Sequence, residues 1–285
     1  MRLDPADQYR RGVSFRKAHE GDRAFVVANA WDAGSARLLS QLGFTALATT
    51  SAGLAFSLGR SDGVNLLARE QALDNARSIV AATPAAVSAD LESCYGTSDE
   101  EIARTIELAA EAGLVGASIE DATGDPRDPI LPVEVAVERV AAAVAAARAL
   151  PFPFTLTARA ENFLYGRDDL KDTVARLQAY QTAGADVLYA PCLPDVEAIR
   201  TVCSTLDKPV NVLAGVGPAL SVAELSACGA RRISLGSAFA RAAIGGFLRA
   251  AREVHEHGTF AFAEQAVPYG ELNALMSEPA TGERS

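Results

Sequence analysis

The strongest constraint on the fold is a regular alternation of short apolar runs and longer amphipathic segments. Eight β-rich runs lie at residues 24–28, 46–50, 85–89, 116–119, 154–158, 186–190, 210–213 and 232–235. Eight alanine-rich segments with helical periodicity lie at 34–42, 69–81, 98–112, 132–149, 170–183, 195–205, 222–228 and 237–255. Eight strand–helix units in one chain favour a closed (β/α)8 barrel of the TIM type over an open doubly wound sheet.

Glycines mark the phase of this repeat. Four of the segments end in a small motif with a central glycine, at residues 42–44, 112–114, 183–185 and 228–230. A glycine just after a helix adopts the left-handed conformation that turns the chain towards the next strand. We therefore expect one barrel domain over residues 1–285, in which 258–285 form a C-terminal helical extension and a polar tail.

Composition excludes several classes of function. The net charge of −10 disfavours nucleic acid and anionic membranes as partners. No apolar run reaches the length of a membrane span, and the N-terminus has no secretory signal pattern, so we expect a cytoplasmic enzyme. The four cysteines lack metal-site spacing and the chain has only three histidines, which directs attention to carboxylate and metal chemistry.

Two acids follow the third apolar run directly. Asp90 and Glu92 are two residues apart, so in an extended segment their side chains point to the same side. Two anions held together repel each other unless a cation lies between them, and a hard divalent ion is the usual solution. An isolated pair of this kind is more often a solvated acidic turn, so the other strand ends decide between the two interpretations.

Polar residues gather at those other ends as well. In a barrel of this kind, catalytic groups come from the carboxyl ends of the strands and from the loops that follow. The residues at these positions are Asn29, Thr50, Ser51, Asp62, Glu120, Asp121, Arg159, Glu161, Asn162, Asn211 and Ser237. We expect Thr50 and Ser51 to bind a carboxylate. We expect Arg159 to bind a second one in bidentate fashion, unless it only forms a structural ion pair with Glu92 or Glu120.

Four motifs resemble one enzyme superfamily in the correct order. In chain order they are Leu58-Gly59-Arg60-Ser61-Asp62, Asp90-Leu-Glu92-Ser-Cys-Tyr95-Gly96, Ile119-Glu120-Asp121 and Ala158-Arg159-Ala160-Glu161. From about residue 15 to 254 the chain is similar to the isocitrate lyase / phosphoenolpyruvate mutase superfamily. Its metal motif is Asp-x-Asp-x-Gly-Tyr-Gly, so Glu92 and Cys94 are departures from the pattern.

The resemblance implies Mg²⁺, or Mn²⁺, bound together with a small 2-oxo acid. It implies Asp90 as the direct metal ligand and Asp62, Glu92 and Glu120 as holders of the metal's water shell. Substrate contacts implied by the match are Thr50, Ser51, Ala52, Arg159 and Asn211. It also implies a homodimer or homotetramer in which the eighth helix is exchanged between barrels.

The bond that is cleaved stays open at the level of sequence. Lyases of the superfamily carry a Lys-(Lys/Arg)-Cys-Gly-His loop after strand four, whereas residues 123–132 contain neither cysteine nor histidine. Arg127 and Asp128 are the remaining catalytic candidates in this loop, beside Glu120 and Arg159, and Cys94 is more consistent with a small buried residue. We expect a Mg²⁺-dependent carbon–carbon lyase acting on a 2-oxo or 2-hydroxy acid through an enolate. The alternatives are a C–P enzyme of the phosphonopyruvate type, an oxaloacetate decarboxylase or hydrolase, and a binding protein that has lost catalysis.

Overall fold

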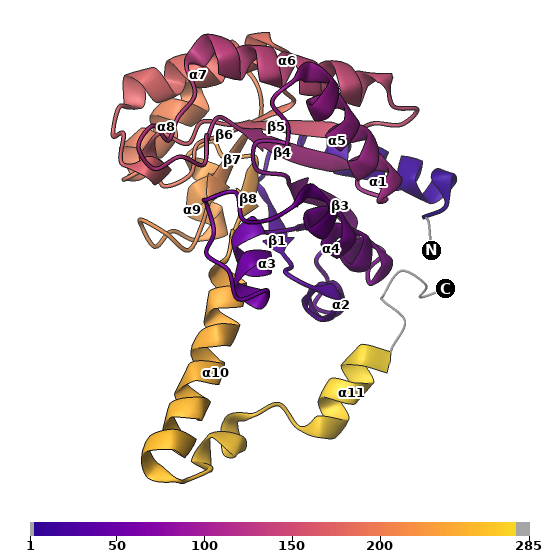
Figure 1. Cartoon of the computed structure of the whole chain (residues 1–285), viewed down its shortest axis with the longest axis vertical. Helices are drawn as coiled ribbons and strands as arrows, with labels where there is room; N and C mark the ends of the chain where they lie inside the picture. The colour runs from indigo at the N-terminus through magenta and orange to yellow at the C-terminus, as the bar shows by residue number, and fades with distance from the viewer. Residues whose placement is uncertain (1–2, 278–285) are drawn as a thin grey trace.

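Eight parallel strands close into a barrel in a computed structural model that describes residues 3–277 (Figure 1). The strands follow chain order and β8 pairs with β1. They are β1 Phe25–Asn29, β2 Ala46–Ala48, β3 Ala86–Asp90, β4 Gly116–Glu120, β5 Thr155–Arg159, β6 Val187–Tyr189, β7 Val210–Leu213 and β8 Arg232–Ser234. The (β/α)8 prediction is confirmed.

Helices surround the barrel on the outside. They are α2 Ala33–Gln41, α4 Arg69–Ala81, α5 Asp99–Glu111, α6 Val133–Ala149, α7 Leu170–Thr182, α8 Val196–Thr205 and α9 Val222–Ala227. Outward strand residues such as Leu47, Ile119 and Leu156 are fully or almost fully buried beneath these helices, which is where the main core lies. The four phase-marking glycines have φ between +92° and +102°, as their sequence context predicts.

Two helices were not anticipated. Helix α1, Pro5–Ala18, precedes the barrel; Asp4 caps its N-terminus, and its Phe15 packs against Val27, Ala46, Ala86 and Val115. Helix α3, Ser51–Ser57, begins at the end of β2 with Thr50 as its N-cap. The segment expected to continue strand two to residue 50 therefore becomes the start of a helix, because the Thr50 hydroxyl accepts the Gly53 N–H.

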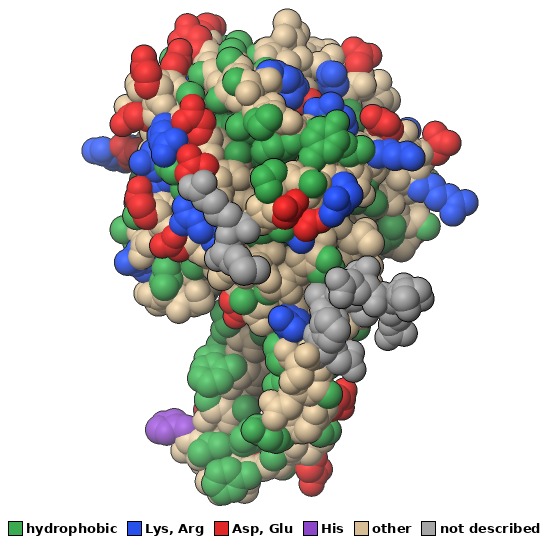
Figure 2. Space-filling model, turned by 90° about the vertical axis from the view of Figure 1, so that its right-hand side faces the viewer, with side chains coloured by type: hydrophobic (Ala, Val, Ile, Leu, Met, Phe, Trp, Pro, Cys, Tyr) green, Lys and Arg blue, Asp and Glu red, His purple; other side chains and the backbone are tan. Residues whose placement is uncertain are grey.

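The eighth helix leaves the barrel. Helix α10, Ala238–His257, extends away from it together with η2 Ala261–Gln265, and α11, Tyr269–Ser277, returns to α2 (Figure 1). Only Ala240 of α10 is buried. We call residues 238–277 the arm. Figure 2 shows hydrophobic side chains along it, and the large exposed ones are Ile244, Phe247, Leu248, Val254, Phe260, Phe262, Val267, Tyr269 and Leu272.

Within residues 3–277, no helix is both long enough and apolar enough to cross a membrane.

Candidate active site

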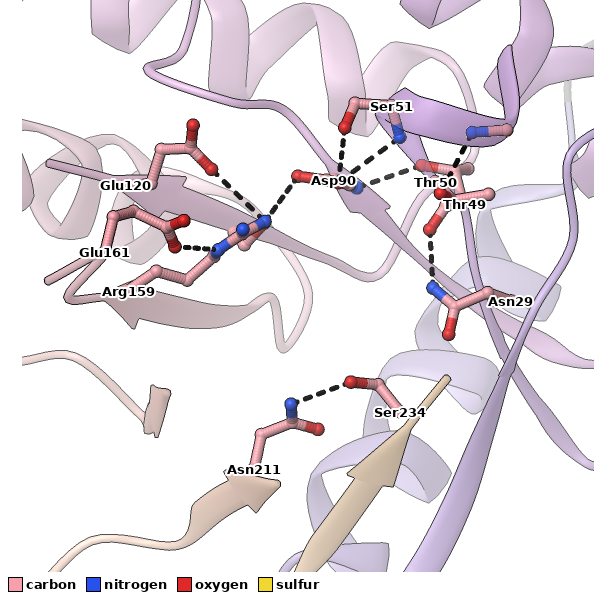
Figure 3. A network of polar contacts seen from close by, with 12 residues as sticks. Asn29, Thr49, Thr50, Ser51, Asp90, Glu120, Arg159, Glu161, Asn211 and Ser234 are labelled. Atoms are coloured by element: carbon pink, nitrogen blue, oxygen red, sulfur yellow. Dashed lines mark hydrogen bonds and ion pairs between the residues drawn. The ribbon is translucent and has the colours of Figure 1, made fainter. Parts of the chain in front are cut away.

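Arginine 159 is the centre of the site. It is the last residue of β5, and strand alternation directs its side chain into the barrel mouth. Its Nη1 lies 2.9 Å from Asp90 Oδ1 and 3.2 Å from Glu120 Oε2, and its Nε lies 2.7 Å from Glu161 Oε1 (Figure 3). The expected convergence of acids from neighbouring strands on one arginine is therefore present, with Asp90 and Glu161 as partners in addition to Glu120.

This cluster contains more negative than positive charge. Burial alone would lower the pKa of Arg159, but Glu161, Glu120 and Asp90 raise it well above its ordinary value. Burial raises the pKa values of Glu120 and Glu161, since charged carboxylates lose hydration there. One guanidinium thus neutralises only part of the carboxylate charge at this end of the barrel.

Glu92 extends the acidic cluster without joining the ion pairs. Burial and the neighbouring Asp90 raise its pKa to about 7. In the described chain its Oε2 atom, like Oε2 of Glu161, is buried and finds no hydrogen-bond partner. Buried polar atoms are seldom left unpaired in native proteins, so these two oxygens are candidates for contact with a ligand, an ion or water.

The turn after β3, which carries Glu92, has an unusual backbone conformation. Glu92, Cys94 and Tyr95 have φ values of +48°, +61° and +51°, which non-glycine residues rarely adopt. Arg139 of α6 ties the turn down, as its Nη2 donates to the carbonyls of Ser93 and Gly96 at 2.6 and 2.7 Å. Such strain concentrates at functional sites.

Ser51 orients Asp90. Its backbone N–H and hydroxyl donate to Asp90 Oδ2 at 3.3 and 3.0 Å, and Thr49 Oγ1 accepts the Asp90 N–H at 2.9 Å (Figure 3). Asp62 lies in the long loop after α3, where burial and the charge of Asp90 raise its pKa. The predicted role of Ser51 as a substrate contact would be met if its hydroxyl rotated from Asp90 to a ligand, whereas its backbone N–H is fixed at the start of α3.

A cavity of about 170 Å³ opens beside the cluster. Of the predicted site residues, it is lined by Thr50, Ser51, Ala52, Asp62, Asp90, Arg159 and Asn211. Glu120 and Glu92 stand behind this lining, within the charge cluster. The size suits a small acid, and the wall combines hydroxyls and carboxylates with one aromatic ring, Tyr189, which lies 5.1 Å from the Arg159 guanidinium.

The loop after β4 does not bring its two candidates to the cavity. Arg127 pairs with Asp125 in the same loop, and its side chain is 89% exposed. Asp128 pairs with Arg167 at 3.1 Å and is also exposed. The loop contacts the Asp62 loop instead through Asn65, whose Nδ2 donates to the Thr123 carbonyl at 3.0 Å.

Cys94 has the structural role expected for it. It is completely buried, and burial raises the pKa of its thiol to about 12. A thiol with this pKa stays protonated near neutral pH and is a poor general acid–base group.

Several cavity residues were missed in the sequence. They include Ser118, whose hydroxyl donates to Asp90 Oδ1 at 3.4 Å, together with Tyr189, Arg232 and Ser234. All four face inward at alternate positions of β4, β6 and β8. Ser118 and Arg232 lie deeper in their strands than the predicted strand-end residues, and Tyr189 and Ser234 end strands that carry no carboxylate or arginine at their last position.

The oxygen-rich cluster fits a hard divalent ion. In the described part of the chain, no three carboxylate, imidazole or thiol groups lie close enough to hold an ion by themselves. The Arg159 guanidinium separates Asp90 from Glu120 and prevents such a cage. Mg²⁺ keeps several waters and takes only one or two protein carboxylates, so direct contact with Asp90 and water-mediated contact with the other acids is compatible with this geometry.

The chain, with its closed barrel and acidic mouth, belongs to a class of α/β-barrel lyases and mutases, as its similarity to known proteins shows. Residues 15–255 match the profile of the family described as phosphoenolpyruvate phosphomutase, which is more than half of the chain. The chain therefore belongs to this family, within the phosphoenolpyruvate mutase / isocitrate lyase superfamily that its motifs resemble.

Individual proteins agree with this assignment. The 2-methylisocitrate lyase of Salmonella typhimurium (strain LT2) is 30% identical over 207 residues, which are 70% of this chain and 68% of that enzyme. A structure from Burkholderia cenocepacia J2315, described as a candidate lyase/mutase, is 53% identical with a TM-score of 0.93 and covers 96% of this chain and 98% of its own. The structure of oxaloacetate acetylhydrolase with its product oxalate is 25% identical, with a TM-score of 0.84 over 96% of this chain and 95% of its own.

Proposed function

We propose that this protein is a Mg²⁺-dependent lyase that cleaves a carbon–carbon bond in a small 2-oxo or 2-hydroxy carboxylic acid. One observation supports this most strongly: carboxylates from three adjacent strands surround Arg159 beside a small cavity, and two carboxylate oxygens there lack partners. An excess of hard oxygen donors next to a cation and an acid-sized cavity suits a metal-bound oxo acid.

The proposed roles follow from the contacts. Asp90 is oriented by Ser51 and Ser118 and is the proposed direct ligand of Mg²⁺, with Asp62, Glu92 and Glu120 holding its waters. When bound, Mg²⁺ would supply electrophilic stabilisation for the negative charge that develops on the 2-oxo oxygen. Arg159 supplies a fixed positive charge next to that position, and Glu161 holds its guanidinium from the Nε side.

The second candidate is an oxaloacetate decarboxylase or hydrolase. It is favoured by the loop at residues 123–132, which lacks the cysteine that lyases of the superfamily use as a general acid. Loss of CO2 from an oxo-dicarboxylate, or attack of water on its 2-oxo carbon, leaves an enolate that can take its proton from solvent. Neither reaction therefore needs a cysteine as general acid. Arg127 and Asp128 keep a proposed role as lid residues, which requires this loop to move over the cavity. A C–P enzyme of the phosphonopyruvate type is the third candidate.

A substrate panel distinguishes these reactions. The protein is incubated with 2-methylisocitrate, 2,3-dimethylmalate, oxaloacetate and phosphonopyruvate, each with Mg²⁺, with Mn²⁺ and with excess EDTA, and products are followed by NMR. We expect turnover of a C–C substrate that EDTA abolishes and Mg²⁺ restores. Turnover of phosphonopyruvate alone contradicts the lyase proposal, and activity that EDTA leaves intact contradicts the metal requirement.

We further propose that the arm covers a second copy of this chain. Burial of its apolar side chains requires a partner, and an exchanged eighth helix would supply one. Light scattering after size-exclusion chromatography is expected to give a dimer or tetramer, and Phe247→Asp is expected to shift it towards monomer. A wild-type monomer at micromolar concentration contradicts the exchange.

A further inference from the structure

The cavity continues downward into the barrel. TIM barrels are normally filled by layers of bulky branched side chains. Here the inward positions beneath the mouth carry small residues, among them Ala48, Ser88, Ser118 and Ser234, and all of these line the cavity. The open space therefore reaches Arg232, the first residue of β8.

Arg232 is a buried cation without a carboxylate. The residue is 6% exposed, and its Nε donates to Asn211 Oδ1 at 2.8 Å. Its Nη1 is buried without a hydrogen-bond partner, and among residues 3–277 no carboxylate lies within ion-pair distance. Arg159, in the same barrel interior, has three such carboxylates.

The neighbouring polar groups fix the guanidinium and do not neutralise it. Asn211 Nδ2 donates to Ser234 Oγ at 2.9 Å (Figure 3). The Asn211 amide is therefore oriented with its oxygen towards Arg232. Thr155 and Thr157 share the inward face of β5 with Arg159, and their hydroxyls are also buried and unpartnered. The floor of the cavity thus presents the positive charge of Arg232, whereas its mouth presents carboxylates.

An uncompensated buried charge is costly. The penalty is several kcal/mol for an ion that leaves water and gains no opposite charge. Burial lowers the pKa of Arg232 to about 10, which reflects the same cost. A bound anion with two oxygens can satisfy the free edge of a guanidinium in the bidentate manner that carboxylates prefer.

We propose that Arg232 forms an anion-binding subsite at the cavity floor that receives a carboxylate of the substrate. This rests on the proposed function, because it narrows the substrate of the same cavity to acids with at least two anionic groups. One anionic group faces Arg159 and the proposed metal site at the mouth, and the second reaches Arg232. Arg232 then determines specificity and takes no part in bond cleavage.

The test measures binding and needs no turnover. Calorimetry and thermal unfolding are carried out with malonate, succinate and the monocarboxylate propionate, in a buffer free of chloride, sulfate and phosphate. The variants are Arg232→Met, which removes the charge, and Arg232→Lys, which keeps it. Arg148→Met is the matched control, since Arg148 pairs with Asp186 on the outside of the barrel.

The wild type is expected to bind at least one dicarboxylate about tenfold more tightly than propionate, and Arg148→Met is expected to do the same. Arg232→Lys is expected to retain part of this preference. Arg232→Met is expected to lose it and, without any ligand, to unfold at the same or a higher temperature than the wild type. A merely structural arginine would instead lower the unfolding temperature when removed.

Three results overturn the subsite: no dicarboxylate preference in the wild type, an undiminished preference in Arg232→Met, or failure of Arg232→Met to fold. None of these depends on the substrate panel. If the panel shows no turnover while the dicarboxylate preference is lost in Arg232→Met, the proposed reaction fails and the subsite stands.

Discussion

Glu120 and Asp121 are adjacent at the end of β4, yet they enter two different charge networks. Asp121 points outward beneath α7, where its Oδ2 accepts from Tyr180 Oη at 2.7 Å and from Arg176 Nη1 at 3.1 Å, and its Oδ1 accepts the Glu161 N–H at 2.8 Å. Both of its oxygens are satisfied. Glu120 points inward and shares one arginine with two other carboxylates.

The difference between the networks separates scaffold from site. The outer network joins β4, β5 and α7, and Arg176 and its neighbours satisfy both oxygens of Asp121, although Arg176 also pairs with Asp172. In the inner network three carboxylates share one arginine and two buried carboxylate oxygens have no partner, so it gains by binding a cation. We therefore expect mutations in the outer network to reduce stability and mutations in the inner one to reduce ligand binding.

The largest effect on folding is expected for Asp121→Asn. Asparagine keeps only one acceptor oxygen, so either the Glu161 N–H or the Tyr180 and Arg176 donors lose their acceptor, and Arg176 is left with Asp172 as its ion-pair partner. The free energy of unfolding is expected to fall by about 3 kcal/mol, in the range for a broken buried ion pair. Urea denaturation of the purified variant measures this.

Glu120→Gln is the matched control on the next residue. Burial raises the pKa of Glu120, so a neutral amide relieves a desolvation cost, and Arg159 keeps its Asp90 and Glu161 partners. Its stability is expected to equal or exceed that of the wild type. An equal loss of stability in both variants would erase the distinction between the networks.

A smaller effect concerns acid stability at the opposite end of the barrel. His19 is buried against Phe15 and Phe25, and burial, followed by the charge of Arg232, lowers its pKa to about 3. As pH falls below 6.5, the unfolded chain gains a proton that the folded chain cannot bind, so His19 reduces stability by up to about 1.4 kcal/mol per pH unit. Glu92, with its pKa raised to about 7, acts in the opposite sense over the same range.

Comparison with His19→Gln isolates the histidine contribution. Between pH 8 and pH 5 the wild type is expected to lose about 2 kcal/mol more than the variant, measured by urea unfolding at each pH. Parallel pH profiles for the two proteins would show that His19 is protonated in the folded state.

The smallest effect is expected for Arg127→Ala. The Arg127 side chain is exposed and paired only within its own loop, so the unfolding temperature should not change. As a lid residue that touches the substrate only on closure, it is expected to lower kcat/KM by about threefold or less on the substrate that the panel identifies. A hundredfold loss would place its guanidinium at the reacting atoms.

Much of the fold was predictable because its period is strong. The eight strands lie within a few residues of their expected positions, and the glycine turns have the backbone conformation that their sequence requires. Helix α1 was not predicted, although Asp4 and Pro5 are typical of a helix N-terminus, because most of its residues are polar. Helix α3 is short and contains glycine, so local propensity could not reveal it.

The site residues at the strand ends could be predicted from the sequence, whereas those deeper in the barrel interior could not. Alternation placed Asp90, Glu120 and Arg159 together, and the structure pairs them. The contribution of Arg232 depends on how small its inward neighbours on other strands are, which only the closed barrel reveals. Arg127 and Asp128 were inferred from loop position alone, and the loop directs them to solvent.

Oxalate binding is the sharpest test of whether the inner carboxylates, with Asp90 as the direct ligand, form a Mg²⁺ site for an oxo acid. Calorimetric titration with oxalate, a stable planar mimic of a pyruvate enolate, is carried out with and without Mg²⁺ on wild type, Asp90→Asn and Asp121→Asn. We expect Mg²⁺-dependent oxalate binding in the wild type and in folded Asp121→Asn, and loss of this binding in Asp90→Asn. Equal oxalate binding without Mg²⁺, or undiminished binding in Asp90→Asn, would contradict this assignment.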